Sequence, residues 1–247
     1  MILKHISLCL LLMLSFAFPV ISQASDKVIK LTSLEWPPYA GVDLPDQGSS
    51  IALVRKAYAA MGYKLEVTFF PWSRAVMLAN DPTSEYAGYF PEYYSDEIAK
   101  KFIYSEEIGF SPLGFAERKS HTVSWTTISD LSRYQIGVVQ DYINTDEFDA
   151  MVLNKELMVS TTLNDTNNLK KLMSGRLDLA VIDKNVMEYV FKTDLSLRKK
   201  AQLAQFNSKL LDQKKLYVCF NNSSQGRELN DILKQGLEKT NPNPKDK

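Results

Sequence analysis

The spacing of apolar and polar positions predicts two successive blocks of strands and helices. In the first block, residues 28–34 are apolar and β-branched enough for a strand, and a helical stripe follows at Ile51, Val54, Tyr58 and Met61. Capping and stop signals flank this stripe, namely Ser49 or Ser50 before it and Gly62 after it. Two more strands are predicted over 64–70 and 85–90, and a short helix that begins at residue 71 lies between them. This order favours a largely parallel sheet with helices on its faces.

The same rhythm returns in the second half of the chain. Its predicted strands are 134–140, 157–161 and 177–182. A helix capped by Asn164 or Thr162 and closed by Gly175 separates the last two, and a segment at 144–153 follows the first. Residues 111–120 mix polar and turn residues and predict a crossover between the blocks. A strand at 216–220, which follows the polar stretch 212–215, and a helix at 227–239 are expected to return the chain to the first block. The polar tail 241–247 is expected to be frayed.

The N-terminus has the three parts of a secretory signal peptide. Lys4 precedes an apolar run at 8–18, and Ser-Gln-Ala at 22–24 is typical of a cleavage site. We therefore expect an exported, periplasmic protein that begins at Ser25. No later segment approaches the roughly 20 apolar residues of a membrane span, and no lipid anchor is evident.

Composition adds limits on size and partners. Removal of residues 1–24 leaves 247 − 24 = 223 residues, which fits one large domain or two small ones. The 29 basic residues become 29 − 1 = 28 with the loss of Lys4, against 29 acidic residues, so the net charge is −1. This balance does not favour nucleic acid or an anionic membrane as a partner. Cys219 is then the only thiol, so no intrachain disulfide can form.

A rigid aromatic loop, Glu-Trp-Pro-Pro-Tyr at 35–39, follows the first predicted strand. Two prolines fix the backbone, so Trp36 and Tyr39 are presented at little entropic cost. The loop either contacts a ligand or is a strand-end turn whose rings cover the core, and the residues alone leave both interpretations open.

Several segments together resemble the type II periplasmic solute-binding proteins, in the amino-acid-binding (family 3) branch of ABC importer components. They are the loop at 35–39, Pro-Trp-Ser-Arg at 71–74, the segments 100–106 and 136–140, and the strand and helix residues at 172–183. The resemblance implies an α/β fold of two lobes, each a mostly parallel sheet flanked by helices, joined by a two-strand hinge. Lobe one would comprise 25–114 and 216–247, and lobe two 115–215.

The resemblance and the strand-end positions give a set of expected ligand-binding residues at the cleft between the lobes. These are Glu35, Trp36, Tyr39, Trp72, Arg74, Tyr89, Phe90, Gln140, Asp141, Tyr142 and Asp183. Asp183 matches the carboxylate that binds a ligand amine in the relatives, although it could also cap the next helix. Arg74 is either an anion clamp or a surface arginine, and Trp72 either stacks on the ligand or packs in the core.

Two departures from the family concern ligand charge. Ile98 stands where the relatives have the arginine that clamps a ligand carboxylate, and Gln140 and Asp141 replace a glycine-threonine pair in the second anion loop. An isoleucine cannot provide the bidentate recognition of a guanidinium, and Asp141 would repel a carboxylate. The resemblance implies a small polar solute, amino-acid-like or another amine-bearing compound. The two departures favour a ligand that is cationic or neutral, with its identity left open.

The sequence favours a binding protein over an enzyme. After the signal peptide, the single histidine is His121 and the single cysteine is Cys219, which argues against histidine-based triads, Cys-His pairs and histidine-rich metal sites. No cofactor or metal is expected. Two alternatives stay open: a ligand-binding sensor for a membrane receptor instead of an ABC permease, and a carboxylate-dependent enzyme in which Glu35 and Asp183 act as acid and base. We expect a monomer.

Overall fold

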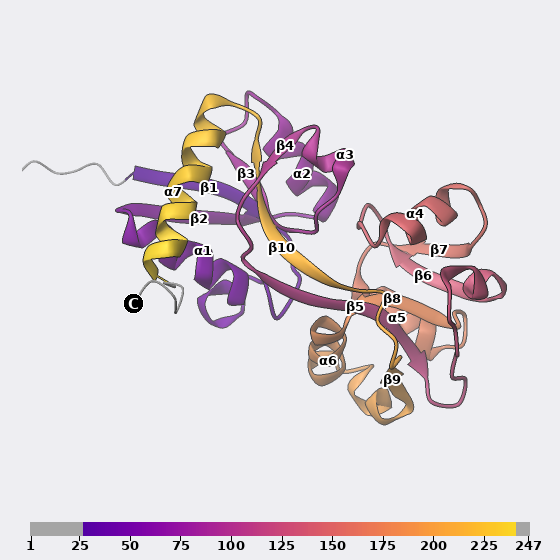
Figure 1. The fold of residues 1–247 in the computed structure, drawn as a ribbon. Helices are drawn as coiled ribbons and strands as arrows, with labels where there is room; N and C mark the ends of the chain where they lie inside the picture. The colour runs from indigo at the N-terminus through magenta and orange to yellow at the C-terminus, as the bar shows by residue number, and fades with distance from the viewer. Residues whose placement is uncertain (1–26, 241–247) are drawn as a thin grey trace, which may run out of the picture.

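The computed structural model describes residues 27–240, and two lobes joined by two long strands are its main feature (Figure 1). The predicted signal peptide and the tail at 241–247 lie outside the described residues. The strands of the described residues form one continuous ten-stranded sheet that extends through both lobes. In the described range, no helix has the length and apolar character needed to cross a membrane.

Lobe one is built on a mostly parallel sheet. Strand β1 pairs in parallel with β2 and with β3, and the lobe-one end of β10 pairs antiparallel with β3 and β4. The strands are β1 (Lys27–Ser33), β2 (Tyr63–Phe69), β3 (Gly88–Glu92), β4 (Phe102–Tyr104) and β10 (Asp212–Asn221). The helices are α1 (Ser49–Ala60), α2 (Trp72–Asn80), α3 (Asp96–Ala99) and α7 (Ser224–Thr240), with a 3-10 turn at Pro45–Gln47.

Lobe two repeats this plan with its own sheet. Strand β6 pairs in parallel with β7 and β8, and β5 closes the sheet by antiparallel pairing with β8 and β9. The strands are β5 (Gly109–Arg118), β6 (Gln135–Val139), β7 (Met158–Thr162), β8 (Leu179–Asp183) and β9 (Ala204–Phe206). The helices are α4 (Asp146–Leu153), α5 (Asp165–Met173) and α6 (Lys184–Thr193), with 3-10 turns at Ile128–Arg133 and Arg198–Leu203.

The predicted α/β fold with two lobes and a two-strand connection is confirmed. Strands β5 and β10, which we call the linking strands, pair with each other over Gly109–Leu113 and Asp212–Leu216 and run from one lobe into the other (Figure 1). The exact lobe boundaries at 114/115 and 215/216 stay a prediction. The predicted crossover at 111–120 consists mostly of strand β5. One local prediction was wrong in extent, because β10 begins at Asp212 instead of residue 216.

The aromatic loop at 35–39 is held by the start of α1. The amides of Ser49 and Ser50 donate to the carbonyls of Pro38 and Tyr39, at 3.1 Å and 3.0 Å. These bonds satisfy helix-terminal N–H groups that would otherwise lack partners. The prediction that Ser49 or Ser50 caps the helix was wrong, because Gly48 is the cap. Its φ of 106° and the 2.5 Å between an added Cβ and the Tyr39 carbonyl oxygen explain the glycine.

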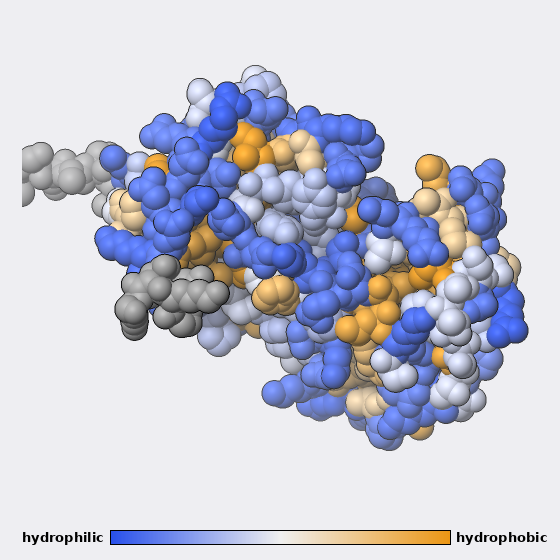
Figure 2. Space-filling view, in the orientation of Figure 1, coloured by the Kyte–Doolittle hydropathy of each residue, from blue (hydrophilic) through white to orange (hydrophobic). Residues whose placement is uncertain are grey.

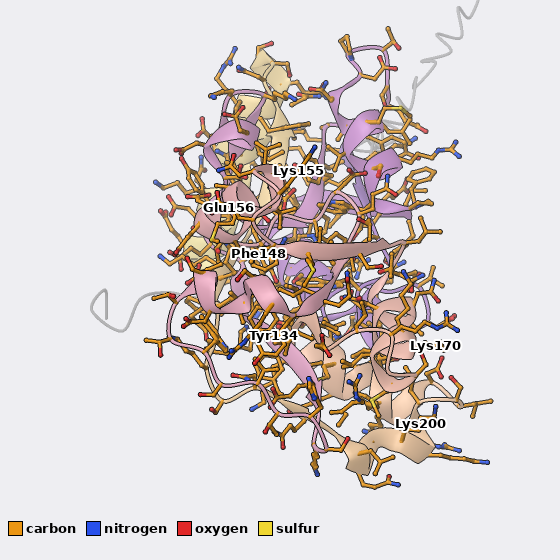
Figure 3. The ribbon with its side chains drawn as sticks, turned by 90° about the vertical axis from the view of Figure 1, so that its right-hand side faces the viewer. Tyr134, Phe148, Lys155, Glu156, Lys170 and Lys200 are labelled. Carbon is orange, nitrogen blue, oxygen red and sulfur yellow. The ribbon has the colours of Figure 1, made fainter. Side chains whose placement is uncertain are left out.

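Apolar packing holds both lobes, and among the described charged residues only Glu92, Glu117, Asp165 and Asp183 are buried. Helix α1 packs closely on α7, where an added Cβ at Gly236 would stand 2.2 Å from the Ala57 carbonyl oxygen. Figure 2 shows a mostly hydrophilic outer surface on the visible face. In Figure 3, which looks onto lobe two, Lys155, Lys170 and Lys200 lie around the exterior, while Phe148 is fully buried.

Candidate functional site

A pocket of about 560 Å³ lies between the lobes. Lobe one contributes Leu34, Glu35 and residues 69–73, and lobe two contributes Gln140, Tyr142, Leu163 and Asn164. We call it the cleft pocket. Glu35 is the only acidic residue among these lining residues, and none of them is a lysine, arginine or histidine. The pocket therefore offers one negative charge, amide groups and several aromatic rings to a solute.

The aromatic loop turns its rings inward and its carboxylate outward. The rings of Trp36 and Tyr39 stack with centroids 4.6 Å apart, and both side chains are only 7% exposed. Glu35 is exposed at the cleft pocket, and one of its oxygens accepts a hydrogen bond from the Val42 amide at 3.0 Å. The loop thus covers the core with its rings while it presents Glu35 to the pocket, so both interpretations of the sequence hold in part.

Tyr39 and Asp183, predicted on opposite sides of the cleft, contact each other. The Tyr39 hydroxyl donates to Asp183 Oδ2 at 3.0 Å and accepts from Asn185 Nδ2 at 2.7 Å. Ser111 on linking strand β5 donates to the same carboxylate oxygen at 2.5 Å, and the hydroxyls of Ser111 and Tyr93 also hydrogen-bond. We call these five residues the interlobe cluster, because they join lobe one, lobe two and a linking strand.

Asp183 also caps α6, which was the alternative role predicted for it from the sequence. Its Oδ1 accepts from the Val186 amide at 2.8 Å, and its side chain is buried. Burial raises the pKa of this carboxyl, while the hydrogen bonds from Ser111, Val186 and Tyr39 oppose the rise. Each oxygen therefore already accepts a bond from the protein.

Two further buried carboxyls near the cleft were not anticipated as site residues. Asp165 opens α5, and burial together with the nearby Asp183 raises its pKa to about 7, while hydrogen bonding from the Trp36 and Tyr142 side chains opposes the rise. Glu92 ends β3, and burial raises its pKa to about 8. A helix-start position was the available signal for Asp165. Glu92 lay just beyond the predicted strand at 85–90, so nothing in the pattern marked it.

Comparison with known proteins gives matches among solved structures only. No protein-family model matches the chain, and no curated protein sequence does. A histidine kinase sensor domain with similarity to periplasmic binding proteins superposes with a TM-score of 0.73 at 15% identity, over 86% of this chain and 89% of that one. An ancestral arginine-binding protein bound to arginine gives 0.71 at 15% identity, over 86% and 92%. The chain has the periplasmic-binding-protein fold.

A third similar structure with this fold is an amino-acid ABC transporter substrate-binding protein of Streptococcus pneumoniae bound to L-arginine. Its TM-score is 0.66 at 17% identity, over 85% of this chain and 88% of that one. The resemblance inferred from the sequence segments is confirmed at the level of fold. Identities this low carry no information on the ligand, so the ligand must be argued from the side chains of the cleft.

In this binding-protein fold, four more of the predicted residues meet at the cleft besides Glu35. Trp72 and Tyr142 approach edge to face with centroids 6.2 Å apart, and Gln140 lines the cleft pocket beside them. Asp141 accepts a hydrogen bond from Ser73 across the cleft. Residues 72 and 140–142 are therefore brought together by the fold, although their part in binding stays a prediction.

The remaining predicted residues lie elsewhere. Arg74 is exposed, with its guanidinium carbon 5.1 Å from the Phe70 ring centroid, and it does not line the cleft pocket. Tyr89 and Phe90 are fully buried in lobe one. Ile98 on α3 packs against the small core cluster that contains Tyr89 and Phe102. The position that holds the carboxylate-clamping arginine in the resembling family is thus part of the apolar packing.

Proposed function

We propose that this protein is an exported solute-binding protein that captures a small, amine-bearing solute between its lobes. The observation that carries the proposal is the cleft pocket, which is lined by both lobes and contains Glu35 but no cationic side chain. A carboxylate is best recognised by an arginine, and an ammonium group by carboxylates, amides and aromatic rings. The lining of this pocket favours the second kind of group.

Closure around the solute follows from the two-sided lining. A solute that touches Trp72 from lobe one and Gln140 from lobe two has more contacts when the lobes are together, so it stabilises the closed arrangement by that difference. The interlobe cluster supplies additional contacts in the closed arrangement. Capture therefore needs no chemical step, no metal and no cofactor.

Delivery to an ABC permease from the periplasm is the role we propose, with the protein as a monomer. A sensor role, in which a membrane receptor binds the loaded protein, uses the same cleft and remains the second candidate, because the similar structures include a sensor domain as well as an importer component. The carboxylate pair suggested for an enzyme is less favoured, since both oxygens of Asp183 accept hydrogen bonds from the protein and one Glu35 oxygen accepts from the Val42 amide.

A thermal-shift panel tests the proposal. Amino acids, opines, polyamines and small peptides are added separately, and a solute that binds only the native state raises the melting temperature. We expect cationic amines to raise it and acidic amino acids to leave it unchanged. Glu35→Gln should reduce the shift, whereas Glu66→Gln, in an exposed ion pair with Lys64 on β2, should not. A panel in which acidic amino acids alone raise the melting temperature contradicts the proposal.

A further inference from the structure

A second, much smaller cavity of about 30 Å³ lies behind the cleft pocket. Four aromatic rings and one carboxyl dominate its lining: Trp36, Trp72, Tyr93, Tyr142 and Glu92. Leu34, Trp72 and Tyr142 line the cleft pocket as well, so the two pockets adjoin at these side chains. We call it the inner cavity.

Glu92 has unused capacity to accept hydrogen bonds on this cavity. Its side chain is buried, with the residue 5% exposed, and accepts from the Tyr89 hydroxyl at 3.1 Å and from the Tyr93 amide at 2.8 Å. A carboxylate offers about four lone-pair sites, so two donors leave about two sites open. Among the described residues, Glu92 takes part in no salt bridge within 4.0 Å.

The cation that acts electrostatically on Glu92 is engaged elsewhere. Lys214, on linking strand β10, places its Nζ 3.7 Å from Asp212 Oδ2 and 5.4 Å from the ring centroid of Tyr93. It favours the charged form of Glu92 electrostatically, without contact. Lys214 therefore does not neutralise the side of Glu92 that faces the inner cavity.

A second carboxyl strengthens the negative character of the cavity walls. Asp165 is buried, and interaction with the side chains of Trp36 and Tyr142 lowers the pKa of its carboxyl against the effect of burial. Hydrogen bonding to a carboxyl orients the two rings and makes the wall more electronegative, and aromatic faces themselves attract cations. The aromatic rings, Asp165 and Glu92 thus all favour a positively charged group in the inner cavity.

We propose that the inner cavity is a subsite for the terminal primary ammonium group of an alkyl chain, with Glu92 as its counter-ion. The assignment rests on the proposed function, because the rest of the solute lies in the cleft pocket. The volume admits an ammonium with its adjoining methylene, since one water-sized probe needs roughly 10–15 Å³. A trimethylammonium head is too large. The solute class is therefore an unbranched primary alkylamine, of which a polyamine is one example.

Binding of three matched probes tests the subsite by isothermal titration calorimetry. The probes are n-pentylamine, 1-pentanol and pentyltrimethylammonium, which share the chain and differ in the head group. We expect n-pentylamine to bind at least about tenfold more tightly than the other two, because only it pairs with Glu92 within the cavity. Glu92→Gln keeps the shape of the side chain and should weaken n-pentylamine by about tenfold or more while 1-pentanol is unchanged.

A matched control and a second readout separate binding from folding. Glu117→Gln removes another buried glutamate, one that accepts from Val123, Gln205 and Asn207 in lobe two, and should leave n-pentylamine binding unchanged. The second readout is proton release, measured in the unmutated protein in two buffers of different ionisation enthalpy. Burial raises the pKa of Glu92 to about 8, so binding of a cation at neutral pH expels a proton. The titratable groups around Glu92 are Tyr89, Tyr93, Tyr104, Tyr142, Lys214 and Cys219, and Lys101 and Asp141 line a neighbouring pocket with it.

The outcomes distinguish the subsite from the proposed function. If Glu92→Gln binds n-pentylamine as tightly as the unmutated protein, or if binding releases no proton, the subsite assignment is wrong while the cleft remains a binding site. If none of the three probes binds but another solute of the thermal-shift panel does, the subsite is again wrong and capture in the cleft stands. If no solute of either set binds, both proposals are contradicted.

Discussion

Two buried carboxyls near the cleft, Asp183 and Glu92, differ in what their oxygens contact. Asp183 accepts from Tyr39 of lobe one, from Ser111 of a linking strand and from the Val186 amide of lobe two. Glu92 accepts only from Tyr89 and Tyr93, both in lobe one, and it faces a cavity. Burial is similar, at 2% and 5% exposed, so burial alone does not tell a structural acid from a candidate ligand-binding one.

The difference lies in the acceptor sites that remain. A carboxylate whose oxygens are filled by donors from two lobes stabilises their arrangement, and a ligand would have to displace those donors. A carboxylate with open acceptor sites beside a cavity pays the cost of burial without full compensation, which is common at functional sites. Asp183 is therefore best explained as a structural link between the lobes, and Glu92 as the carboxyl that is available to bind a ligand.

Removal of Asp183 should have the largest effect on stability. Asp183→Ala deletes the cap of α6 and leaves Ser111, Tyr39 and the Val186 amide without their acceptor. A lost cap costs about 1 kcal/mol and unsatisfied buried donors cost about 1–3 kcal/mol, so we expect a loss of about 3 kcal/mol in the free energy of unfolding. Urea denaturation followed by circular dichroism measures it. A loss below about 1 kcal/mol would show that Asp183 is not the structural acid of the pair.

Glu92 should instead make stability depend on pH. Its pKa rises from 4.5 to about 8 on folding, so the folded state holds the proton more tightly. The neutral form is the stable one, and the contribution of Glu92 is lost as the pH rises from about 5 through about 8. Between about pH 6 and about pH 8 the unmutated protein should lose about 2 kcal/mol relative to Glu92→Gln.

Paired denaturation curves at the two pH values give the measurement. Asp165, whose pKa is about 7, and Asp183 titrate in both proteins, so the difference between the protein and Glu92→Gln isolates Glu92. Parallel pH profiles in the two proteins would mean that Glu92 is ionised and paired like Asp183, and the contrast between the two acids would disappear.

The approach of Tyr39 to Asp183 could be predicted because both lie at strand ends in a fold whose strand order fixes where those ends meet. The inward orientation of Glu92 could not. Strand β3 is buried at all five positions, and whether its last residue faces solvent or a cavity depends on α2 and β10, which are distant in sequence. Local spacing carries no information on that packing.

The polar start of β10 and the position of Arg74 illustrate the same limit. Residues 212–215 are polar and their side chains do not alternate between buried and exposed, so the sequence resembles a loop. They nevertheless pair with β5, because here the strand passes from one lobe to the other. Arg74 lies two residues after Trp72 on α2, and on a helix this spacing places the two side chains on different faces. Trp72 lines the cleft pocket, whereas Arg74 is not part of its lining and its guanidinium lies against the ring of Phe70.

Tyr39→Phe should sharpen the comparison with a smaller effect. The substitution keeps the ring stacked on Trp36 and removes the hydroxyl that bonds Asp183 and Asn185 across the lobes. One hydrogen bond to a charged group contributes about 1–2 kcal/mol, so closure and hence solute affinity should weaken by about fivefold or more. Calorimetry with the best solute of the panel measures the change. Unchanged affinity would show that the interlobe cluster does not contribute to closure.

The smallest effect is expected from the other contact across the cleft. Ser73 donates to Asp141, but both residues are exposed, so water replaces the bond when the lobes separate. Exposed polar contacts contribute about 0–1 kcal/mol, and Ser73→Ala should change solute affinity by less than about twofold. The same titration as for Tyr39→Phe measures it. A loss of affinity as large as that of Tyr39→Phe would mean that exposed contacts hold the lobes together as effectively as buried ones. Buried hydrogen-bond partners would then not distinguish Asp183 from Glu92.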